Sequence, residues 1–369
     1  MKTLLKWAGG KERELKLILP KLPDTINNYY EPFLGGGAVY FNLTKVKNEC
    51  FLNDASNELI DFYNIIKQKD QNFFIILESI NESWKEISEI YTQKKENMFS
   101  HYIDFKEERI TEDDVRQLML AESRFFAGLL AENNERLNVL EKEVFKSLVN
   151  KFKRTKKLES KKGNLPTDDI HKIFVSAIKS GYYTFIRELY NNPQKYNVNN
   201  VEYTALFLCM RMYCYSGMFR YNKNGEFNVP YGGIGYNNNN LDNKLNYYKS
   251  TKLHEKFINT KFYNLDFERF LDNCELTEND FLFLDPPYDT EFSTYAKNTF
   301  GREDQIRLSK YLKNNVRAKW MLVIKSTDFI LDLYSNNNLV IDAVYKKYNV
   351  SFMDRNNKDV THLIIRNYQ

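Results

Sequence analysis

The tetrapeptide Asp285-Pro286-Pro287-Tyr288 is the part of this sequence whose residue types most clearly imply chemistry. Proline fixes φ and lacks a backbone N–H, so two consecutive prolines stiffen the turn and leave it without donors. The turn therefore presents acceptors, namely carbonyls and a carboxylate, with an aromatic ring beside them. Such a site suits a planar group that carries an NH2. The alternative interpretation is an ordinary proline turn.

A second chemical feature is the segment from Glu31 to Gly37, whose sequence is EPFLGGG. Glycines between a strand and a helix allow a ligand to approach the backbone closely, although they also serve simple turns. Asp54 follows at about the 20-residue spacing of the acid that binds ribose hydroxyls in nucleotide-binding βαβ units. The two features together indicate a site for an adenosine-type cofactor. A helix N-cap is an equally compatible role for Asp54.

The third feature is the N-terminal segment Lys6–Lys11, whose sequence is KWAGGK. A tryptophan between lysines is unfavourable in a loose tail, and Lys11 can neutralise a carboxylate. The alternative is a mobile tail with a glycine bend. The spacing is not that of a phosphate-binding P-loop, because GxxxxGK[ST] is absent from the sequence.

Strand and helix patterns place these motifs at the ends of strands. The all-apolar segment Phe281–Leu284, directly before Asp285, is typical of a strand buried on both faces. Ligands bind at the carboxyl ends of such strands in open α/β sheets. The start of the chain also reads as βαβα, and the pattern returns near Lys261. The other predicted elements are strands at Tyr29–Phe33, Cys50–Asn53, Trp320–Ile324, Leu339–Val344 and His362–Ile365, and helices at Ala38–Leu43, Asn57–Lys67 and Arg302–Leu312.

Between these parts, from about Gln71 to Glu188, the pattern is helical and charged. We therefore expect an α/β catalytic domain that is split in sequence, with residues 1–68 and 255–369 on either side of an insertion at 69–254. Within the insertion, Lys151–Lys162 holds seven basic residues and one acidic residue. This run is either a phosphate-contacting segment or a solvated helix end.

Composition limits the class of protein. Of 369 residues, 43% are hydrophobic and 15% aromatic, which is enough for a sizeable core and excludes global disorder. The 53 basic and 49 acidic residues give a formal net charge of +4, which excludes a polycation but allows a local basic face. No apolar run approaches the ~18 residues of a membrane span, and the start resembles no signal peptide. Four cysteines without a CxxC pair predict no metal site and a cytoplasmic location.

Taken together, the motifs resemble those of the Dam-type (alpha-group) DNA adenine-N6 methyltransferase family. KWAGGK, EPFLGGGAVYFNL, NDASNELI and DPPY occur in the family's order, with the target-recognition insertion before DPPY. The resemblance covers about residues 1–68 and 200–369. It implies a Rossmann-like, S-adenosylmethionine-dependent methyltransferase sheet with a largely helical target-recognition insertion. It also implies a DNA-facing β-hairpin at residues 211–235.

The resemblance also implies roles for individual residues. Asp285, Pro286 and Tyr288 would form the catalytic site. The expected DNA contacts lie in the hairpin, where Ser216 stands in place of the family's usual Asn: Tyr215 and Ser216 near the flipped base, and Arg220 as a guanine reader, with a phosphate contact as the alternative. Asn222 and Lys223 are expected contacts because basic and aromatic groups interleave from Arg220 to Lys223. The expected S-adenosylmethionine contacts are Trp7, Lys11, Phe33, Gly35, Gly37, Asp54, Asp266, Phe267 and Asp285.

The chemistry of the implied reaction fits these residue types. The adenine amine is a poor nucleophile because its lone pair is delocalised into the ring. Acceptance of its hydrogens by Asp285 and the Pro286 carbonyl favours a tetrahedral nitrogen, which attacks the sulfonium methyl and leaves S-adenosylhomocysteine. In a duplex the base must first flip out. Stacking of the flipped base on Tyr288 would return roughly 1–3 kcal/mol.

We therefore expect a site-specific adenine methyltransferase acting on double-stranded DNA, without a metal and without a nucleophilic cysteine. A separate restriction endonuclease is a possible partner. Two alternatives remain: methylation of the exocyclic amine of cytosine or of a base in structured RNA, and a catalytically silent DNA-binding relative. Families of this kind often recognise GATC, and Arg220 is consistent with a guanine before the adenine.

Overall fold

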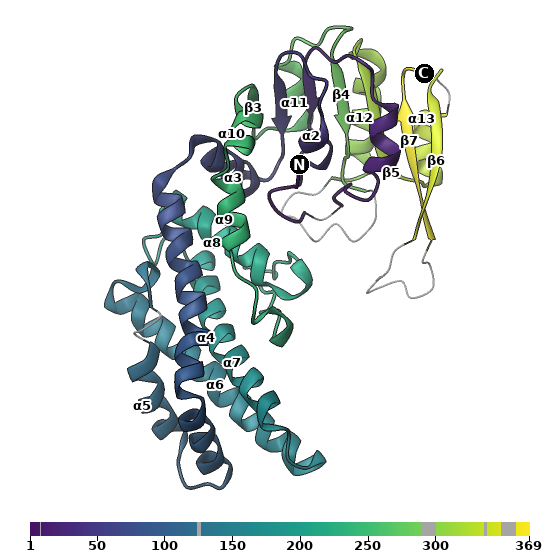
Figure 1. Ribbon diagram of the computed structural model, residues 1–369. Coiled ribbons are helices and arrows are strands. Elements are labelled where there is room, and N and C mark those ends of the chain that lie inside the picture. The colour runs from purple at the N-terminus through teal and green to yellow at the C-terminus, as the bar shows by residue number, and fades with distance from the viewer. Residues whose placement is uncertain (8, 124–126, 289–299, 336–337, 348–358) are drawn as a thin grey trace. The chain divides into compact units, whose positions relative to one another are not determined.

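The computed structural model (Figure 1) describes residues 1–7, 9–123, 127–288, 300–335, 338–347 and 359–369. The chain divides into two compact units. Residues Met1–Lys67 and Thr251–Gln369 form the first, which we call the sheet unit. Residues Gln68–Ser250 form the second, which we call the helical unit. No helix among the described residues combines the length and the apolar character needed to cross a membrane.

A seven-stranded sheet with the order β3-β2-β1-β4-β5-β7-β6 forms the centre of the sheet unit. The first five strands in this order are mutually parallel, and β7 runs antiparallel to both of its neighbours. The carboxyl ends of β1, β2 and β4 therefore lie side by side at one edge. The strands are β1 (Tyr29–Glu31), β2 (Cys50–Asn53), β3 (Thr260–Tyr263), β4 (Phe281–Leu284), β5 (Lys319–Lys325), β6 (Val340–Lys347) and β7 (Asp359–Arg366).

Helices cover this sheet on both faces (Figure 1). All of β4 is buried, as its apolar sequence predicts. Leu282 and Leu284 pack in one cluster with residues of α11, α12 and α13. Side chains alternate along a strand, so Phe281 and Phe283 point to the opposite face. The helices of the unit are α1 (Leu15–Ile18), η1 (Leu19–Lys21), α2 (Ala38–Asn42), α3 (Asn57–Gln68), α10 (Thr251–Phe257), α11 (Phe267–Asp272), α12 (Arg302–Asn314) and α13 (Asp328–Tyr334).

The helical unit consists of long helices, as the sequence pattern from Gln71 onward predicts. Gly181 of α7 allows close packing against α6, because a Cβ there would lie 2.4 Å from Cα of Val144. A buried ion pair, Arg136 to Glu202 at 2.6 Å, joins α6 to α8. The elements are α4 (Gln71–Lys106), α5 (Glu112–Ser123), η3 (Leu129–Ala131), α6 (Asn134–Lys162), α7 (Thr167–Asn191), α8 (Asn200–Tyr213), η4 (Tyr215–Gly217), η5 (Ile234–Tyr236) and α9 (Asp242–Tyr248).

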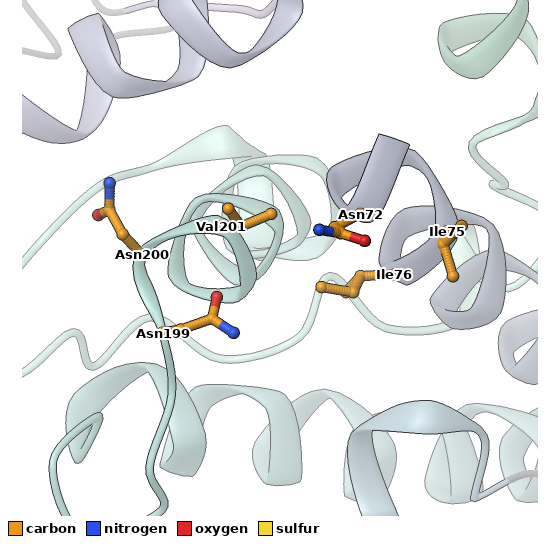
Figure 2. A pocket seen from close by; sticks show the side chains of 6 residues that line it. All are labelled: Asn72, Ile75, Ile76, Asn199, Asn200 and Val201. Atoms are coloured by element: carbon orange, nitrogen blue, oxygen red, sulfur yellow. The ribbon is translucent and has the colours of Figure 1, made fainter. Parts of the chain in front are cut away.

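The helical unit also has a surface hollow between the first turns of α4 and α8 (Figure 2). None of the residues with an expected catalytic or binding role lines this hollow. Its lining is Asn72, Ile75, Ile76, Asn199, Asn200 and Val201.

The segment expected to form a β-hairpin follows α8. Its two limbs pair in antiparallel fashion at the isolated bridges Cys214–Tyr231 and Tyr221–Phe227. Backbone N–H groups of Asn222 and Asn228 donate to carbonyls of the opposite limb at 2.8 and 3.2 Å. The pairing is limited to these isolated bridges, and the 3-10 turn η4 interrupts one limb, so the segment forms no regular β-strand.

Candidate active site

The turn after β4 brings its carboxylate to a buried lysine from the N-terminus. Nζ of Lys11 donates to Oδ1 of Asp285, and also to the carbonyl of Gly9 at 2.9 Å. The Lys11 side chain is only 2% exposed, so this ion pair is largely shielded from water. The same Nζ lies 3.2 Å from the hydroxyl of Tyr288. Lys11 is therefore held by the turn after β4 and does not belong to a loose tail.

Two further residues hold the same turn, and the sequence pattern did not single them out. Nε2 of Gln305, a buried residue of α12, donates to the carbonyl of Pro287 at 2.8 Å. Nε2 of His362, a buried residue of β7, lies 2.9 Å from the hydroxyl of Tyr288. Each is a polar side chain within an otherwise amphipathic or apolar segment. A buried polar side chain needs a hydrogen-bonding partner, so a polar residue in such a segment is the sequence signal that could have indicated these contacts.

The glycine loop after β1 is tied to the end of β2 by Asp54. Oδ2 of Asp54 accepts from the backbone N–H of Gly35 at 2.8 Å, and Oδ1 accepts from that of Ser56 at 2.9 Å. Burial raises the pKa of Asp54 above its usual value, and these two hydrogen bonds oppose the rise. The hydroxyl of Ser56 accepts from Leu59 N at 3.3 Å, so Ser56 rather than Asp54 caps the following helix.

Trp7 lies directly against the glycine loop. A Cβ placed on Gly35 would lie 2.9 Å from Cδ1 of the Trp7 indole. Gly35 and Gly37 have φ of +49° and +67°, in the left-handed region that glycine adopts readily. The loop therefore combines a backbone that only glycine accommodates well with an aromatic side chain packed against it.

The ends of β1, β2 and β3 are linked by Asn53, which the sequence analysis did not single out. Its Nδ2 donates to the carbonyls of Pro32 and Leu265, each at 3.0 Å, and its Oδ1 accepts from Leu265 N at 2.9 Å. Asn53 is 1% exposed. This buried amide fixes the loop before α11 against the glycine loop.

The expected cofactor residues after β3 form an aromatic and charged cluster. The rings of Phe33 and Phe267 lie 5.7 Å apart, and the guanidinium of Arg307 lies 4.5 Å from the Phe267 ring. Asp266 accepts from Glu268 N at 3.1 Å and forms a 2.7 Å ion pair with Arg307. Asp266 therefore caps α11 and anchors Arg307.

The expected DNA-contacting residues all belong to the helical unit. Tyr215 is 43% exposed, and Ser216 has φ of +56°, a conformation that side-chain-bearing residues rarely adopt. Arg220 uses Nε to donate to Oδ1 of Asn228 at 3.0 Å, and Lys223 is exposed. The Asn222 side chain is engaged within the turn, where its Oδ1 accepts two backbone N–H groups and its Nδ2 donates to a carboxylate.

Among the described residues, no group of three or more His, Cys, Asp or Glu side chains could hold a metal ion. All four cysteines are free thiols. Burial raises the pKa of Cys214 to about 11 and that of Cys274 to about 12, so neither is an activated nucleophile.

The mixed sheet and the acceptor-lined turn after β4 fit an enzyme that methylates an amine. The chain belongs to the family of D12 class N6 adenine-specific DNA methyltransferases, whose family model matches residues 7–177 and 161–348. The resemblance to Dam-type enzymes is thereby confirmed, as are the α/β fold class and the activity of an adenine-specific DNA methyltransferase.

Individual relatives are similar over most or all of their length. The chain is 26% identical over 372 residues to the Type II methyltransferase M.CviBI of Paramecium bursaria Chlorella virus NC1A, with 100% of both chains covered. It is 28% identical over 384 residues to the Type II methyltransferase M.MjaIII of Methanocaldococcus jannaschii, covering 100% of this chain and 99% of the relative. The DNA adenine methylase of Escherichia coli K12 is 28% identical over 339 residues, covering 89% and 82%.

Proposed function

We propose that this enzyme transfers the methyl group of S-adenosylmethionine to the N6 amine of an adenine that is flipped out of double-stranded DNA. The observation that carries the proposal is the convergence of Lys11, Asp285 and Tyr288 on one turn. That turn follows β4, whose neighbour β1 leads into the glycine loop. A site for an amine and a site for a nucleoside thus lie at adjacent strand ends.

The chemistry of the donor set fits the cofactor. Asp54 is a half-buried carboxylate whose pKa is raised, and hydroxyl donors from a ribose would stabilise its charged form. The loop from Gly35 to Gly37 offers close backbone approach, with Trp7 beside it. The rings of Phe33 and Phe267 suit an adenine face. S-adenosylmethionine supplies an electrophilic methyl group on a sulfonium.

The turn after β4 would bind and orient the target amine. Oδ atoms of Asp285 and the carbonyl of Pro286 accept its two hydrogens, which favours a tetrahedral nitrogen with an available lone pair. Lys11 keeps Asp285 paired with a positive charge and fixes its orientation. Gln305 already engages the carbonyl of Pro287, which supports Pro286 as the acceptor for substrate. Tyr288 offers an aromatic face to the flipped base.

The helical unit would recognise the target site through the segment after α8. Tyr215 is an exposed aromatic next to the strained Ser216, which suits a residue inserted into the duplex beside the flipped base. The Nε–Asn228 bond orients the guanidinium of Arg220, and its two terminal nitrogens suit the bidentate contact that reads guanine. Asn222 is engaged in its own turn, so we assign it a role in shaping the segment beside Lys223.

The experiment is long-read sequencing of DNA from a methylation-free host that expresses the chain. We expect N6-methyladenine at one sequence motif. Asp285→Asn is the matched control, because the amide can still accept from Lys11 but carries no charge; we expect no methylation and retained binding to duplex DNA. Plasmids with single-base changes in GATC then test the recognition sequence.

Two results would contradict the proposal. Unmethylated DNA from cells with folded wild-type protein would favour an RNA substrate or a silent DNA-binding relative. Methylation by Asp285→Asn at the wild-type rate would overturn the assignment of Asp285. Binding of S-adenosylhomocysteine, measured by calorimetry with wild-type protein and Asp54→Ala, tests the cofactor site separately.

A further inference from the structure

One face of α6 carries a row of exposed lysines, which we call the lysine stripe: Lys142, Lys146, Lys153, Lys157 and Lys161. Their spacings of four and seven residues return to the same side of a helix that turns about every 3.6 residues. Leu148, Phe152 and Thr155 are buried on the opposite side, where α6 packs into the unit. The stripe therefore faces solvent, and it is about 28 Å long at ~1.5 Å per residue.

The structure divides the basic run Lys151–Lys162 between two environments. Lys153, Lys157 and Lys161 belong to the stripe, and Lys142 and Lys146 extend it beyond the run. Lys151 is half-buried, and its pKa is lowered by burial and by the nearby Arg154. The position of a lysine around the helix axis therefore decides whether it belongs to the stripe, and its place in the basic run does not.

Only one lysine of the stripe pairs with a carboxylate among the described residues. Glu112 pairs with Lys153 at 2.6 Å. Within the part of the chain that the structure describes, no carboxylate pairs with the other four lysines of the stripe. Like charges four residues apart on a helix destabilise it by roughly 0.2–0.5 kcal/mol a pair, and the stripe contains such pairs at 142/146, 153/157 and 157/161. A polyanion along this face would remove that repulsion.

Acidic side chains of the same unit gather on a different helix. Glu78, Glu82, Glu86 and Glu89 recur on one side of α4, again at helical spacing. The two helices thus differ in charge: α6 holds ten basic and four acidic residues, whereas α4 holds four basic and six acidic residues. The net charge of the whole chain, only +4, conceals this difference.

We propose that the lysine stripe binds backbone phosphates of duplex DNA outside the methylated site, without reading its sequence. The inference uses the DNA substrate of the family and does not depend on the roles assigned to Asp285 or Asp54. DNA is favoured over an acidic protein because it is the substrate of the family and presents a regular row of negative charges that complements a row of lysines. A strand presents a phosphate about every 3.4 Å, so a row about 28 Å long can follow several of them.

The test compares two quadruple variants of the full chain. The stripe variant carries Lys142→Gln, Lys146→Gln, Lys157→Gln and Lys161→Gln. The control carries Lys→Gln at 95, 172, 195 and 249, four lysines of the same unit that lie against Glu96, Asp169, Glu188 and Glu78. Both lose four charges, and glutamine preserves helix propensity. Circular dichroism checks that both fold.

Binding to 12- and 40-bp duplexes that share the target site is measured at several salt concentrations. Each phosphate contact contributes about 0.9 to the slope of log K against log salt. On the 40-bp duplex, we expect the slope of log K against log salt for the stripe variant to decrease by the equivalent of two to four phosphate contacts. We also expect its affinity to fall at least tenfold. On the 12-bp duplex we expect little change, and kcat with saturating short duplex should be unchanged.

Two outcomes would overturn the proposal. The first is an equal salt slope and an equal advantage of long over short DNA in the stripe variant and wild type. The second is an equal loss in the stripe and control variants, which would show only the effect of net charge. If neither DNA length nor salt distinguishes the variants, a protein partner becomes the better occupant. Methylation by Asp285→Asn at the wild-type rate, with an intact salt slope, would overturn the role assigned to Asp285 and leave this inference standing.

Discussion

The hydroxyl of Tyr288 lies 2.9 Å from Nε2 of His362, although the two residues are 74 apart in sequence. The same hydroxyl lies 3.2 Å from Nζ of Lys11, which can only donate. The phenol oxygen therefore accepts from Lys11, and it shares a second hydrogen bond with the imidazole of His362. Pairing of β7 with β5 fixes His362 opposite Lys325. Two buried partners thus hold the ring that we propose stacks on the flipped base.

This relationship predicts that His362 positions Tyr288. His362→Leu should lower kcat/KM about tenfold, equivalent to one hydrogen bond of about 1.4 kcal/mol. His362→Gln, whose amide can both donate and accept a hydrogen bond, should recover part of the loss. Fluorescence of 2-aminopurine at the target position reports stacking of the flipped base and should change in the leucine variant only. Full additivity of His362→Leu with Tyr288→Phe would disprove the coupling.

Removal of Asp285 should affect stability as well as activity. Lys11 is 2% exposed, so Asp285→Ala leaves a buried ammonium without its counter-charge and should lower the free energy of unfolding by about 3 kcal/mol. Lys11→Met combined with Asp285→Ala removes both charges and should restore most of that stability. Urea unfolding of the three proteins measures it. A double variant less stable than Asp285→Ala would show that the pair is not coupled.

The glycine loop offers a matched pair of substitutions. Gly35 has φ of +49°, and a Cβ there would lie 2.9 Å from the Trp7 ring. Gly35→Ala should therefore cost about 1–2 kcal/mol of stability and weaken binding of S-adenosylhomocysteine. At Gly36 a Cβ would lie 3.4 Å from its nearest neighbour, an ordinary contact, so Gly36→Ala should keep both. Calorimetry that finds equal binding by the two variants would exclude a cofactor role for the loop conformation.

Sequence reasoning succeeded where the determining information was local. Apolar runs such as Phe281–Leu284 marked strands, and the motifs at their carboxyl ends therefore fell at one sheet edge. Contacts that depend on long-range pairing were not predictable in this way. The residues next to His362 give no sign that it contacts Tyr288, because the two side chains meet only when β7 pairs with β5 in the folded sheet. The expected DNA role of Asn222 followed from its place among basic and aromatic residues, whereas its side chain completes a local turn.

The buried carboxyl group of Glu31 should make the stability of the protein depend on pH, although Glu31 has no role in the proposed reaction. It is fully buried at the end of β1 and accepts from the hydroxyl of Tyr29 at 2.9 Å. Burial is the main reason that its pKa lies well above the ordinary 4.5; the charges of Asp285 and Asp54 add to the rise, and the Tyr29 bond opposes it. The folded state therefore keeps a proton that the unfolded state has lost.

Stability should accordingly fall as pH rises from about 4.5 through the raised pKa of Glu31, by up to ~1.4 kcal/mol per pH unit while the proton difference persists. Glu31→Gln keeps the shape and the bond to Tyr29 but cannot ionise, so it should remove this slope and be more stable than wild type at the alkaline end. Glu278→Gln, at an exposed position, serves as the control. Urea unfolding from pH 5 to 8 measures all three proteins. Parallel curves for wild type and Glu31→Gln would mean that Glu31 has the same charge in the folded and unfolded states.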